Sequence, residues 1–488
     1  MIPVLTKEQA YKLDKDTIES GYLSQEELMD NAGKAVAQFF CEKIRNPFSK
    51  TVIVVCGKGN NGADGVVAHS YLKKYNVSSK IVFTETKHGH SKLLKKYKIS
   101  ESEISVYNDK IKFDKYDWII DGIFGIGLSR NLSDKYIKII KELNKNKNLI
   151  SIDIPSGAFS DGTDFYLEDS VVNSKFTITF GFPKLGHFLV PISNLFISDI
   201  GFKTISSNIQ KIEFSDIANI LKSLNKKRNV HKYTKGKCQI IAGSYIYPGA
   251  SILCSLAAQK TGSGYVHLFF EDPTDNENYI DNLNCQLSDI IVSNYINQEH
   301  DNYSPTLVGS GRDESIFFFQ YEEEYKVLDM NNRYIIDAGE IYPCSMHVYP
   351  EKSIITPHFG EYKDLIDIEE GISIEKWHLE EAQKGISKRI IILKSFNTFI
   401  ITEDMIYIMD RGPSLLATAG TGDVLSGILV SLLSQGYSRL EASILGTYLH
   451  AEAANYYMNN ISKDGMTASD LIDCIPLAFN ELRKNSEL

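Results

Sequence analysis

The sequence contains few cysteines, and none of them is arranged as a pair. Its seven cysteines are odd in number, and no two of them stand in a Cys-x-x-Cys pattern. Scattered single cysteines are typical of reduced thiols. The sequence therefore indicates neither a disulfide framework nor a zinc site built on paired cysteines.

Long apolar runs and an excess of positive charge are also missing. No stretch reaches the roughly 18 to 20 apolar residues that a membrane helix needs. The first residues lack the basic flank and apolar core of a signal peptide, so we expect a cytoplasmic protein. The formal net charge of -10 argues against a nucleic acid as the principal partner.

The length indicates more than one domain. A chain of 488 residues exceeds what one hydrophobic core usually supports, so two domains are expected, with three as the alternative. From about 205 to 235 the sequence turns polar and contains the basic run 226–228. We place the boundary there, which predicts domains at 1–210 and 225–488.

A glycine-rich loop follows the first clear strand pattern. Residues 51–56 form the short, continuously apolar run that is typical of a parallel strand covered on both faces. Residues 57–65 are rich in glycine and lead into a helical pattern, as in a phosphate-binding turn at the carboxyl edge of a doubly wound sheet. Asn60, Asn61 and Asp64 add polar groups that a bare turn does not need.

Two later strand patterns end in aspartates, Asp121 and Asp153. Because neighbouring parallel strands deliver their carboxyl ends to one edge, these groups and the glycine loop are expected to share a crevice. Each aspartate alone could be a helix cap or a turn former. Their recurrence at successive strand ends favours a site.

A second glycine turn lies near the C-terminus. Gly420 and Gly422 precede Asp423, after which apolar residues recur, so a helix is predicted to begin at or near Asp423. Free N–H groups and the helix dipole attract an anion there, and the carboxylate can take a proton from a hydroxyl beside a phosphate. The alternative is an ordinary aspartate cap. Upstream, a second α/β domain is predicted, with strands at 237–242, 266–270, 306–308, 334–336, 353–355 and 390–393.

Residues 55–65, 121–127 and 153–157 resemble the YjeF N-terminal family, whose members with intact motifs are NAD(P)H-hydrate epimerases. The resemblance implies a Rossmann-like three-layer sandwich, with Asp121 as catalytic acid/base. It implies a potassium ion held by Asn61, Asp121 and Ser156. The implied substrate contacts are Asn60, Asn61, Gly62, Ala63, Asp64, Gly125, Ile126, Gly127, Leu128 and Asp153. The family usually has glycine at position 63, and a methyl group there requires ordinary backbone angles.

Residues 242–250, 356–361 and 418–427 are similar to the ribokinase-like family of ADP- or ATP-dependent NAD(P)H-hydrate dehydratases. The resemblance implies an α/β/α domain in which Asp423 activates the hydrate hydroxyl for phosphorylation, after which phosphate leaves. The implied hydrate site comprises Ala250, Gly311, His358 and Asp423. The implied nucleotide site comprises Lys394, Ser395, Phe396, Asn397, Thr398 and Gly422. Phe359 replaces a usual proline, Ser395 a usual glycine and Thr418 a commoner asparagine. Ser310 and Arg312 depart from the usual Gly-Pro-Gly-Leu run. Together we expect these departures to weaken nucleotide affinity, with Ser395 mattering most.

Together the two resemblances predict a bifunctional repair enzyme for hydrated nicotinamide nucleotides. Its expected small molecules are NADHX, NADPHX, ADP or ATP, potassium and Mg²⁺, and a homo-oligomer is expected from the family. One alternative is a ribokinase-superfamily kinase of a vitamin-like alcohol, against which residues 247–250 and 356–358 argue. Another alternative makes the N-terminal half a non-catalytic binding module, against which Asp121 argues.

Overall fold

The structure, a computed structural model, describes residues 1–162, 170–192, 194–223, 231–270, 277–294, 303–312, 331–341, 346–366 and 374–486. The chain divides into two compact units. One comprises Pro3–Ser207 with Gly371–Lys376, and the other comprises Met1–Ile2, Asn208–Glu370 and Trp377–Leu488. The domain ranges 1–210 and 225–488 remain our proposal, and position 225 lies outside the described residues.

The N-terminal unit is built on a parallel sheet. Its strands are β2 (Thr51–Cys56), β3 (Ser78–Phe83), β4 (Ile104–Val106), β5 (Trp118–Gly122), β6 (Leu149–Ile152), β7 (Phe176–Phe180) and β8 (Leu195–Ser198). They lie in the order β4-β3-β2-β5-β6-β7-β8, and all of the pairings are parallel. The three strands that precede the predicted polar residues, β2, β5 and β6, are therefore neighbours.

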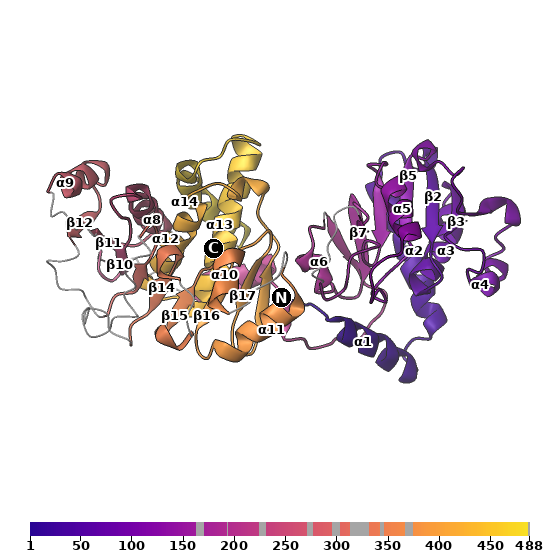
Figure 1. The fold of residues 1–488 in the computed structure, drawn as a ribbon, viewed down its shortest axis with the longest axis horizontal. Helices are drawn as coiled ribbons and strands as arrows, with labels where there is room; N and C mark the ends of the chain where they lie inside the picture. The colour runs from indigo at the N-terminus through magenta and orange to yellow at the C-terminus, as the bar shows by residue number, and fades with distance from the viewer. Residues whose placement is uncertain are drawn as a thin grey trace. The chain divides into compact units, whose positions relative to one another are not determined.

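Helices cover both faces of this sheet (Figure 1). They are α1 (Lys7–Glu19), α2 (Gln25–Lys43), α3 (Asn60–Lys74), α4 (Ser91–Lys96), α5 (Asp134–Leu143) and α6 (Gly186–Leu189), with 3-10 turns at Pro47–Ser49, Glu101–Glu103 and Phe113–Lys115. Val52 and Val54 pack with α2 and α3, whereas Ile53 and Val55 pack with α5. Alternate residues of β2 thus face opposite helix layers, as expected from the period of a strand. The predicted three-layer sandwich is confirmed.

Helix α1 is fixed near the loops that follow the strands. Thr6 accepts a hydrogen bond from the backbone N–H of Gln9, whose side chain accepts one from the Thr6 N–H, so a capping box starts the helix at Lys7. Ala10 and Leu13 then pack against Ile126 and Phe182. This packing holds the adjacent residues of α1, Tyr11 and Asp14, beside the loops after β5 and β7.

The C-terminal unit has a mixed sheet. Its strands are β1 (Ile2–Pro3), β9 (Ile209–Lys211), β10 (Lys237–Ile241), β11 (Tyr265–Phe270), β12 (Ile291–Asn294), β13 (Thr306–Val308), β14 (Tyr334–Ile336), β15 (Ser353–Ile355), β16 (Ile390–Leu393), β17 (Thr398–Ile401) and β18 (Ile406–Met409). Their order is β1-β9-β18-β17-β16-β15-β14-β13-β10-β11-β12. The seven neighbouring strands β16, β15, β14, β13, β10, β11 and β12 are parallel to one another, whereas β17 runs antiparallel to both β16 and β18. The six predicted strands of this half are confirmed, and the antiparallel β17–β18 pair was not predicted.

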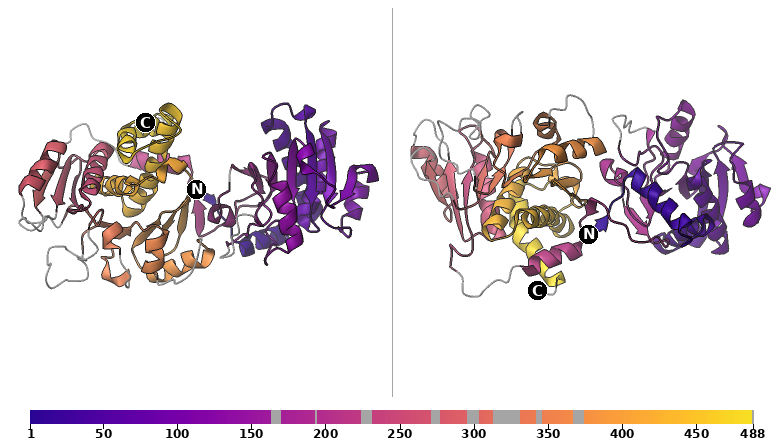
Figure 2. Two further views of the ribbon diagram at one scale, coloured as in Figure 1. Left: turned by 45° about the horizontal axis from the view of Figure 1, so that its top comes forward. Right: turned by 90° about the horizontal axis from the view of Figure 1, so that it is seen from below.

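The helices of this unit are α7 (Phe214–Ser223), α8 (Pro248–Thr261), α9 (Glu277–Gln286), α10 (Phe359–Leu365), α11 (Lys376–Gly385), α12 (Thr421–Ser434), α13 (Arg439–Asn460) and α14 (Ala468–Asn485), with 3-10 turns at Ala338–Glu340, Met346–Val348 and Ser414–Leu416. Helices α8, α12, α13 and α14 share one hydrophobic core with the sheet. Helices α13 and α14 stand together in Figure 1, and in Figure 2 their yellow ribbons again lie together. Among the described residues, no helix combines the length and the hydropathy that crossing a membrane requires.

Candidate functional site

A cavity of about 1160 Å³ lies at the carboxyl edge of the N-terminal sheet. Helices α1, α2 and α3 and the loops after β5 and β6 contribute to its walls. Most of the predicted substrate residues line it, namely Asn60, Asn61, Asp64, Gly125, Ile126, Gly127, Leu128 and Asp153. Gly62 and Ala63 are buried in the first turn of α3 and are not among the lining residues that the structure describes. The glycine loop and Asp153 therefore share a cavity as predicted, whereas Asp121 is not among its described lining residues.

The glycine loop is tightly packed against its neighbours. A Cβ on Gly57 would lie 2.0 Å from the Ile123 carbonyl oxygen, and one on Gly62 would lie 2.0 Å from the Gly57 carbonyl oxygen. Ala63, by contrast, lies inside helix α3 and is not among the residues with positive φ. Its backbone angles are ordinary, so the alanine is compatible with the loop.

Asp121 is completely buried within β5 and accepts four hydrogen bonds. Ser156 donates to it twice, from its hydroxyl at 2.6 Å and its backbone N–H at 2.9 Å. The Ser151 hydroxyl and the Ile123 N–H donate at 3.0 and 3.2 Å. Burial raises the pKa of Asp121, and these hydrogen bonds counteract that rise. Asp121 is not among the described cavity-lining residues. Its hydrogen bonds instead join β5 to β6 and to the loops that follow these two strands.

Asn61 and Ser156, two of the predicted potassium ligands, meet at Phe124. The Asn61 side-chain amide donates to the Phe124 carbonyl at 2.7 Å, and the Phe124 N–H donates to the Ser156 hydroxyl at 2.9 Å. The Asn61 Oδ1 atom is buried and has no hydrogen-bond donor among the described residues. Oxygen atoms of this kind suit a hard cation, so these residues fit the predicted ion.

Asp153 is held in an unusual conformation by two residues that the sequence reasoning missed. Its φ is 64°, in the left-handed region. Lys184 donates to its carboxylate at 2.8 Å. His187 accepts from the Lys184 N–H through Nδ1, so its Nε2 carries a proton and donates to the Asp153 carbonyl at 2.7 Å. Although burial opposes ionisation, Lys184 brings the pKa of Asp153 below its usual value.

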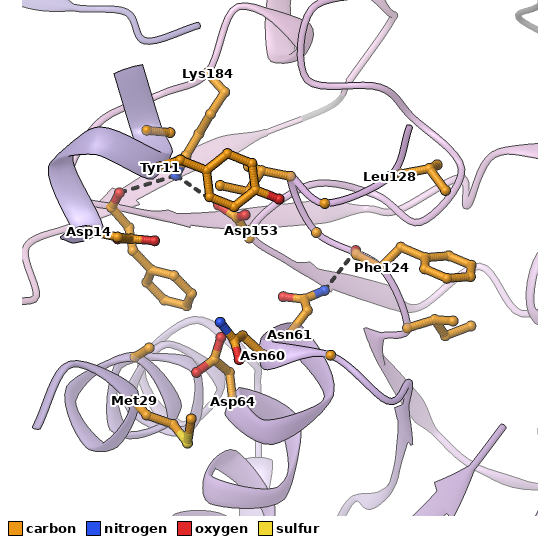
Figure 3. A pocket seen from close by; sticks show the side chains of 18 of the residues that line it. Tyr11, Asp14, Met29, Asn60, Asn61, Asp64, Phe124, Leu128, Asp153 and Lys184 are labelled. Carbon is orange, nitrogen blue, oxygen red and sulfur yellow. Dashed lines mark hydrogen bonds and ion pairs between the residues drawn. The ribbon is translucent and has the colours of Figure 1, made fainter. Parts of the chain in front are cut away.

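Helix α1 brings two further residues, Tyr11 and Asp14, to the cavity wall. Figure 3 shows Asp14 near Lys184 and Asp153, with Asp64 reaching the same cavity from α3. Burial raises the pKa of Asp14 to about 6, with Lys184 lowering it and Asp153 raising it. Burial also raises the pKa of Asp64 well above its usual value. Asp14 was missed because its helix precedes the first motif. A local signal was its position three residues after Tyr11, which places the two side chains on one face of the helix.

In the C-terminal unit, Asp423 lies in the first turn of α12. The helix begins at Thr421 after Gly420, whose φ of 87° lies in the left-handed region, so the predicted glycine turn and helix start are confirmed. Burial and the Asp337 carboxylate raise the pKa of Asp423 and Lys394 lowers it, which together bring the pKa to about 7. At neutral pH this carboxyl group is therefore close to half ionised.

Asp337 organises the surroundings of Asp423, although the sequence reasoning gave it no role. Lys394 donates to it at 3.0 Å, the Ser310 hydroxyl at 2.8 Å and the Thr356 hydroxyl at 2.7 Å. A Cβ on Gly422 would lie 3.5 Å from the Lys394 ammonium nitrogen. Two predicted nucleotide residues, Lys394 and Gly422, are thereby brought together from distant segments.

Two of the predicted hydrate residues, Ala250 and Gly311, lie against one another, and a third, His358, lies beside Lys394. A Cβ on Gly311 would lie 2.4 Å from the Ala250 Cβ. The backbone of His358 pairs with that of Lys394, and the exposed His358 caps α10 by accepting from the Glu361 N–H at 3.1 Å.

Two of the departures from the family pattern in the C-terminal unit, Phe359 and Ser395, leave the local backbone regular. Phe359 occupies the first position of α10, where proline is common because its missing N–H is not needed. Ser395 is exposed. Neither residue prevents its segment from folding.

Two protein families match the chain. The family described as YjeF-related protein N-terminus matches residues 25–186. The family described as NAD(P)H-hydrate dehydratase matches residues 238–477. The two matches correspond to the segments that carry the two polar sites.

Relatives match along almost the whole chain. The bifunctional NAD(P)H-hydrate repair enzyme Nnr of Dictyoglomus turgidum is 30% identical, over 93% of this chain and 94% of that protein. That of Thermofilum pendens is 27% identical, over 97% of this chain and 96% of that protein. A crystal structure of the ADP/ATP-dependent NAD(P)H-hydrate dehydratase from Bacillus subtilis is 21% identical with a TM-score of 0.48, covering 57% of this chain and all of that one. The chain belongs to the family of bifunctional NAD(P)H-hydrate repair enzymes.

Proposed function

We propose that the N-terminal unit interconverts the R and S forms of NAD(P)HX, and that the C-terminal unit dehydrates the S form to NAD(P)H. The dehydration would consume ADP or ATP and release AMP or ADP with phosphate. Membership of the family supports both activities. The observation that carries the proposal is Asp423, a buried carboxyl group with a pKa of about 7 beside Lys394 at a helix start.

In the dehydratase, Asp423 acts as the general base. It takes the proton from the hydrate hydroxyl, whose oxygen attacks the terminal phosphorus of the nucleotide. The pKa near neutrality suits this role, because the carboxylate is available while proton transfer is still favourable. Phosphate then leaves with its C–O bond electrons, a neighbouring carbon loses a proton, and the ring double bond returns. The hydrate would contact Ala250, Gly311 and His358.

Lys394 and the start of α12 would hold the nucleotide. The first turn of α12, which includes Gly422, can donate free N–H groups to an anion, and Lys394 adds a positive charge beside it. Ser395, Phe396, Asn397 and Thr398 complete the proposed nucleotide site. Mg²⁺ would neutralise phosphate charge, and the nearby carboxylates of Glu361 and Asp423 are oxygen ligands of the kind that it accepts.

In the epimerase, Asn61, Asp121 and Ser156 would hold potassium. The buried, unpartnered Asn61 Oδ1 supports this assignment. The potassium ion would supply a fixed positive charge near the hydrated ring. The resemblance gives Asp121 the role of catalytic acid/base. Its carboxylate also accepts hydrogen bonds from Ser151, Ser156 and Ile123, so a change there would disorganise the cavity edge. The substrate contacts we propose are the cavity-lining residues of the glycine loop and of the segments 125–128 and 153, together with Gly62 and Ala63.

A single assay tests both activities. A mixture of the two hydrate epimers is incubated with the full chain, K⁺ and Mg²⁺, and with ADP, ATP or no nucleotide. Recovery of the NAD(P)H absorbance should depend on nucleotide and should consume both epimers. Recovery that stops at the S epimer would contradict the epimerase assignment. No recovery with either nucleotide would contradict the dehydratase assignment and favour a small-molecule kinase.

We also propose a homo-oligomer in the cytoplasm. Light scattering coupled to gel filtration should give a mass above that of one chain. A monomer would contradict the oligomer, and fluorescence of the tagged protein at a membrane would contradict the location.

A further inference from the structure

We propose that Asp14 and Asp64 are the two proton-transferring groups of the epimerase, and that inversion proceeds by loss and re-addition of water. The inference rests on the proposed epimerase activity and names the groups that carry it out. The resemblance assigns proton transfer to Asp121 and not to either of these carboxyl groups, and Asp14 lies outside every motif, so the inference departs from the family pattern.

The two carboxyl groups reach one cavity from different elements. Asp14 projects from α1 and Asp64 from α3, and both line the cavity (Figure 3). Within the part of the chain that the structure describes, neither side chain has a hydrogen-bond donor. Burial keeps their pKa values raised. Partly buried carboxyl groups that line a cavity without a partner are available to a substrate, and such perturbed groups gather at functional sites.

The other aspartates near the cavity are engaged elsewhere. Asp153 accepts hydrogen bonds from Lys184 and the Thr179 hydroxyl, at 2.8 and 3.0 Å. Asp121 accepts four hydrogen bonds and is fully buried. Lys184 holds the pKa of Asp153 below its usual value, which makes Asp153 a poor proton donor, and Asp121 is not among the described residues that line the cavity. Asp14 and Asp64 are therefore the carboxyl groups best suited to proton transfer.

The reaction requires one acid and one base. The hydrated carbon carries a hydroxyl group and is bonded to the ring nitrogen. The acid donates a proton to the hydroxyl as the C–O bond breaks, the nitrogen lone pair forms a C=N bond, and water leaves. A water molecule then adds to the opposite face, its proton passes to the base, and the C=N electrons return to nitrogen. One water is lost and one gained, and the acid and base have exchanged states, ready for the reverse direction.

The surroundings give the two groups different proton affinities. Asp14 faces the Lys184 ammonium group and the Asp153 carboxylate, with Tyr11 beside it on α1. Asp64 faces the same Lys184 and the two carboxylates of Asp14 and Asp153. Asp14, with a pKa of about 6, is mostly ionised at neutral pH. Burial also raises the pKa of Asp64 well above its usual value, so we assign Asp14 as the base and Asp64 as the acid of the pair.

Two substitutions in the full chain test the inference. Asp14→Asn keeps the shape but cannot exchange a proton, whereas Asp14→Glu keeps the carboxyl group. Asp16→Asn, at an exposed position of the same helix, is the matched control. The rate of conversion of purified R to S epimer is followed without nucleotide. The same reactions are run in ¹⁸O-labelled water, and thermal unfolding verifies folding.

We expect Asp14→Asn to lower the epimerisation rate by about 100-fold or more, in the range of a lost acid–base catalyst. Asp14→Glu should recover part of this loss, and Asp16→Asn should leave the rate unchanged. Each inversion should introduce one solvent oxygen. The decline in rate below pH of about 6 should disappear in Asp14→Asn, because the group that titrates there is gone.

Two outcomes would overturn the inference while leaving the epimerase intact. One is a folded Asp14→Asn chain that epimerises within threefold of the unchanged chain. The other is inversion without solvent oxygen. A failure of the unchanged chain to epimerise would instead overturn the proposed function, and the inference with it.

Discussion

At the scale of single residues, Asp423 acquires its chemistry from its neighbours. An exposed aspartate is ionised at neutral pH and is a weak base. Burial and the Asp337 carboxylate raise the pKa of Asp423 to about 7, while Lys394 limits the rise. Asp337 itself is held by the Ser310 and Thr356 hydroxyls, so its charge stays at a fixed distance from the base.

The pH dependence of dehydration follows from this environment. Since Asp423 must be ionised to act as a base, the rate of S-epimer dehydration should fall as the pH decreases through about 7. Asp423→Asn should abolish dehydration and leave epimerisation unchanged. Initial rates between pH 5 and pH 9 measure both. A rate that is flat down to pH of about 5 would contradict the role of Asp423.

The buried Lys184–Asp153 ion pair is expected to stabilise the N-terminal unit. Lys184→Met would leave the Asp153 carboxylate buried without its cation and should lower the free energy of unfolding of the N-terminal unit by about 3 kcal/mol. Because the pKa of Asp153 is lowered in the folded state, its stabilising contribution is present at neutral pH and is lost on acidification. Urea titration measures the change, with Lys12→Met at an exposed position of α1 as control. Equal stability of the two variants would contradict the importance of the pair.

At the scale of elements, the turn from β2 into α3 depends on close backbone contacts. Gly62→Ala would place a methyl group 2.0 Å from the Gly57 carbonyl, where only backbone atoms could move. We expect it to lower epimerisation at least tenfold. The adjacent Ala63→Gly should change the rate little and should cost about 1 kcal/mol of stability through helix propensity. Epimerisation rates and unfolding curves of the two variants compare them, and equal rates would contradict a tight loop.

Local sequence signals predicted some elements of this fold and missed the residues that tertiary packing brings together. The strands β2, β5 and β6 and the turn before α12 were predictable because apolar runs and glycine turns are local signals. Asp14, Lys184 and Asp337 were missed as site residues because tertiary packing brings them to their partners. The burial of Asp121 within β5 was equally hidden, since a strand-end position does not reveal which way the side chain points.

At the scale of the whole molecule, one chain carries two polar sites, each in its own compact unit. A dehydratase specific for the S epimer leaves the R epimer unrepaired unless an epimerase converts it. We expect the hydrate to diffuse between the two sites through solvent, in which case the two activities can cooperate from separate polypeptides. The division of labour can therefore be tested by separating them.

The most direct measurement combines two variants of the full chain. Asp121→Ala should dehydrate only the S epimer, and Asp423→Asn should only epimerise. We predict that an equimolar mixture of the two variants, given both epimers with ADP, K⁺ and Mg²⁺, recovers all of the NAD(P)H absorbance. Asp121→Ala alone should stop when the S epimer is exhausted. A mixture that recovers no more than Asp121→Ala alone would contradict two independent sites on this chain.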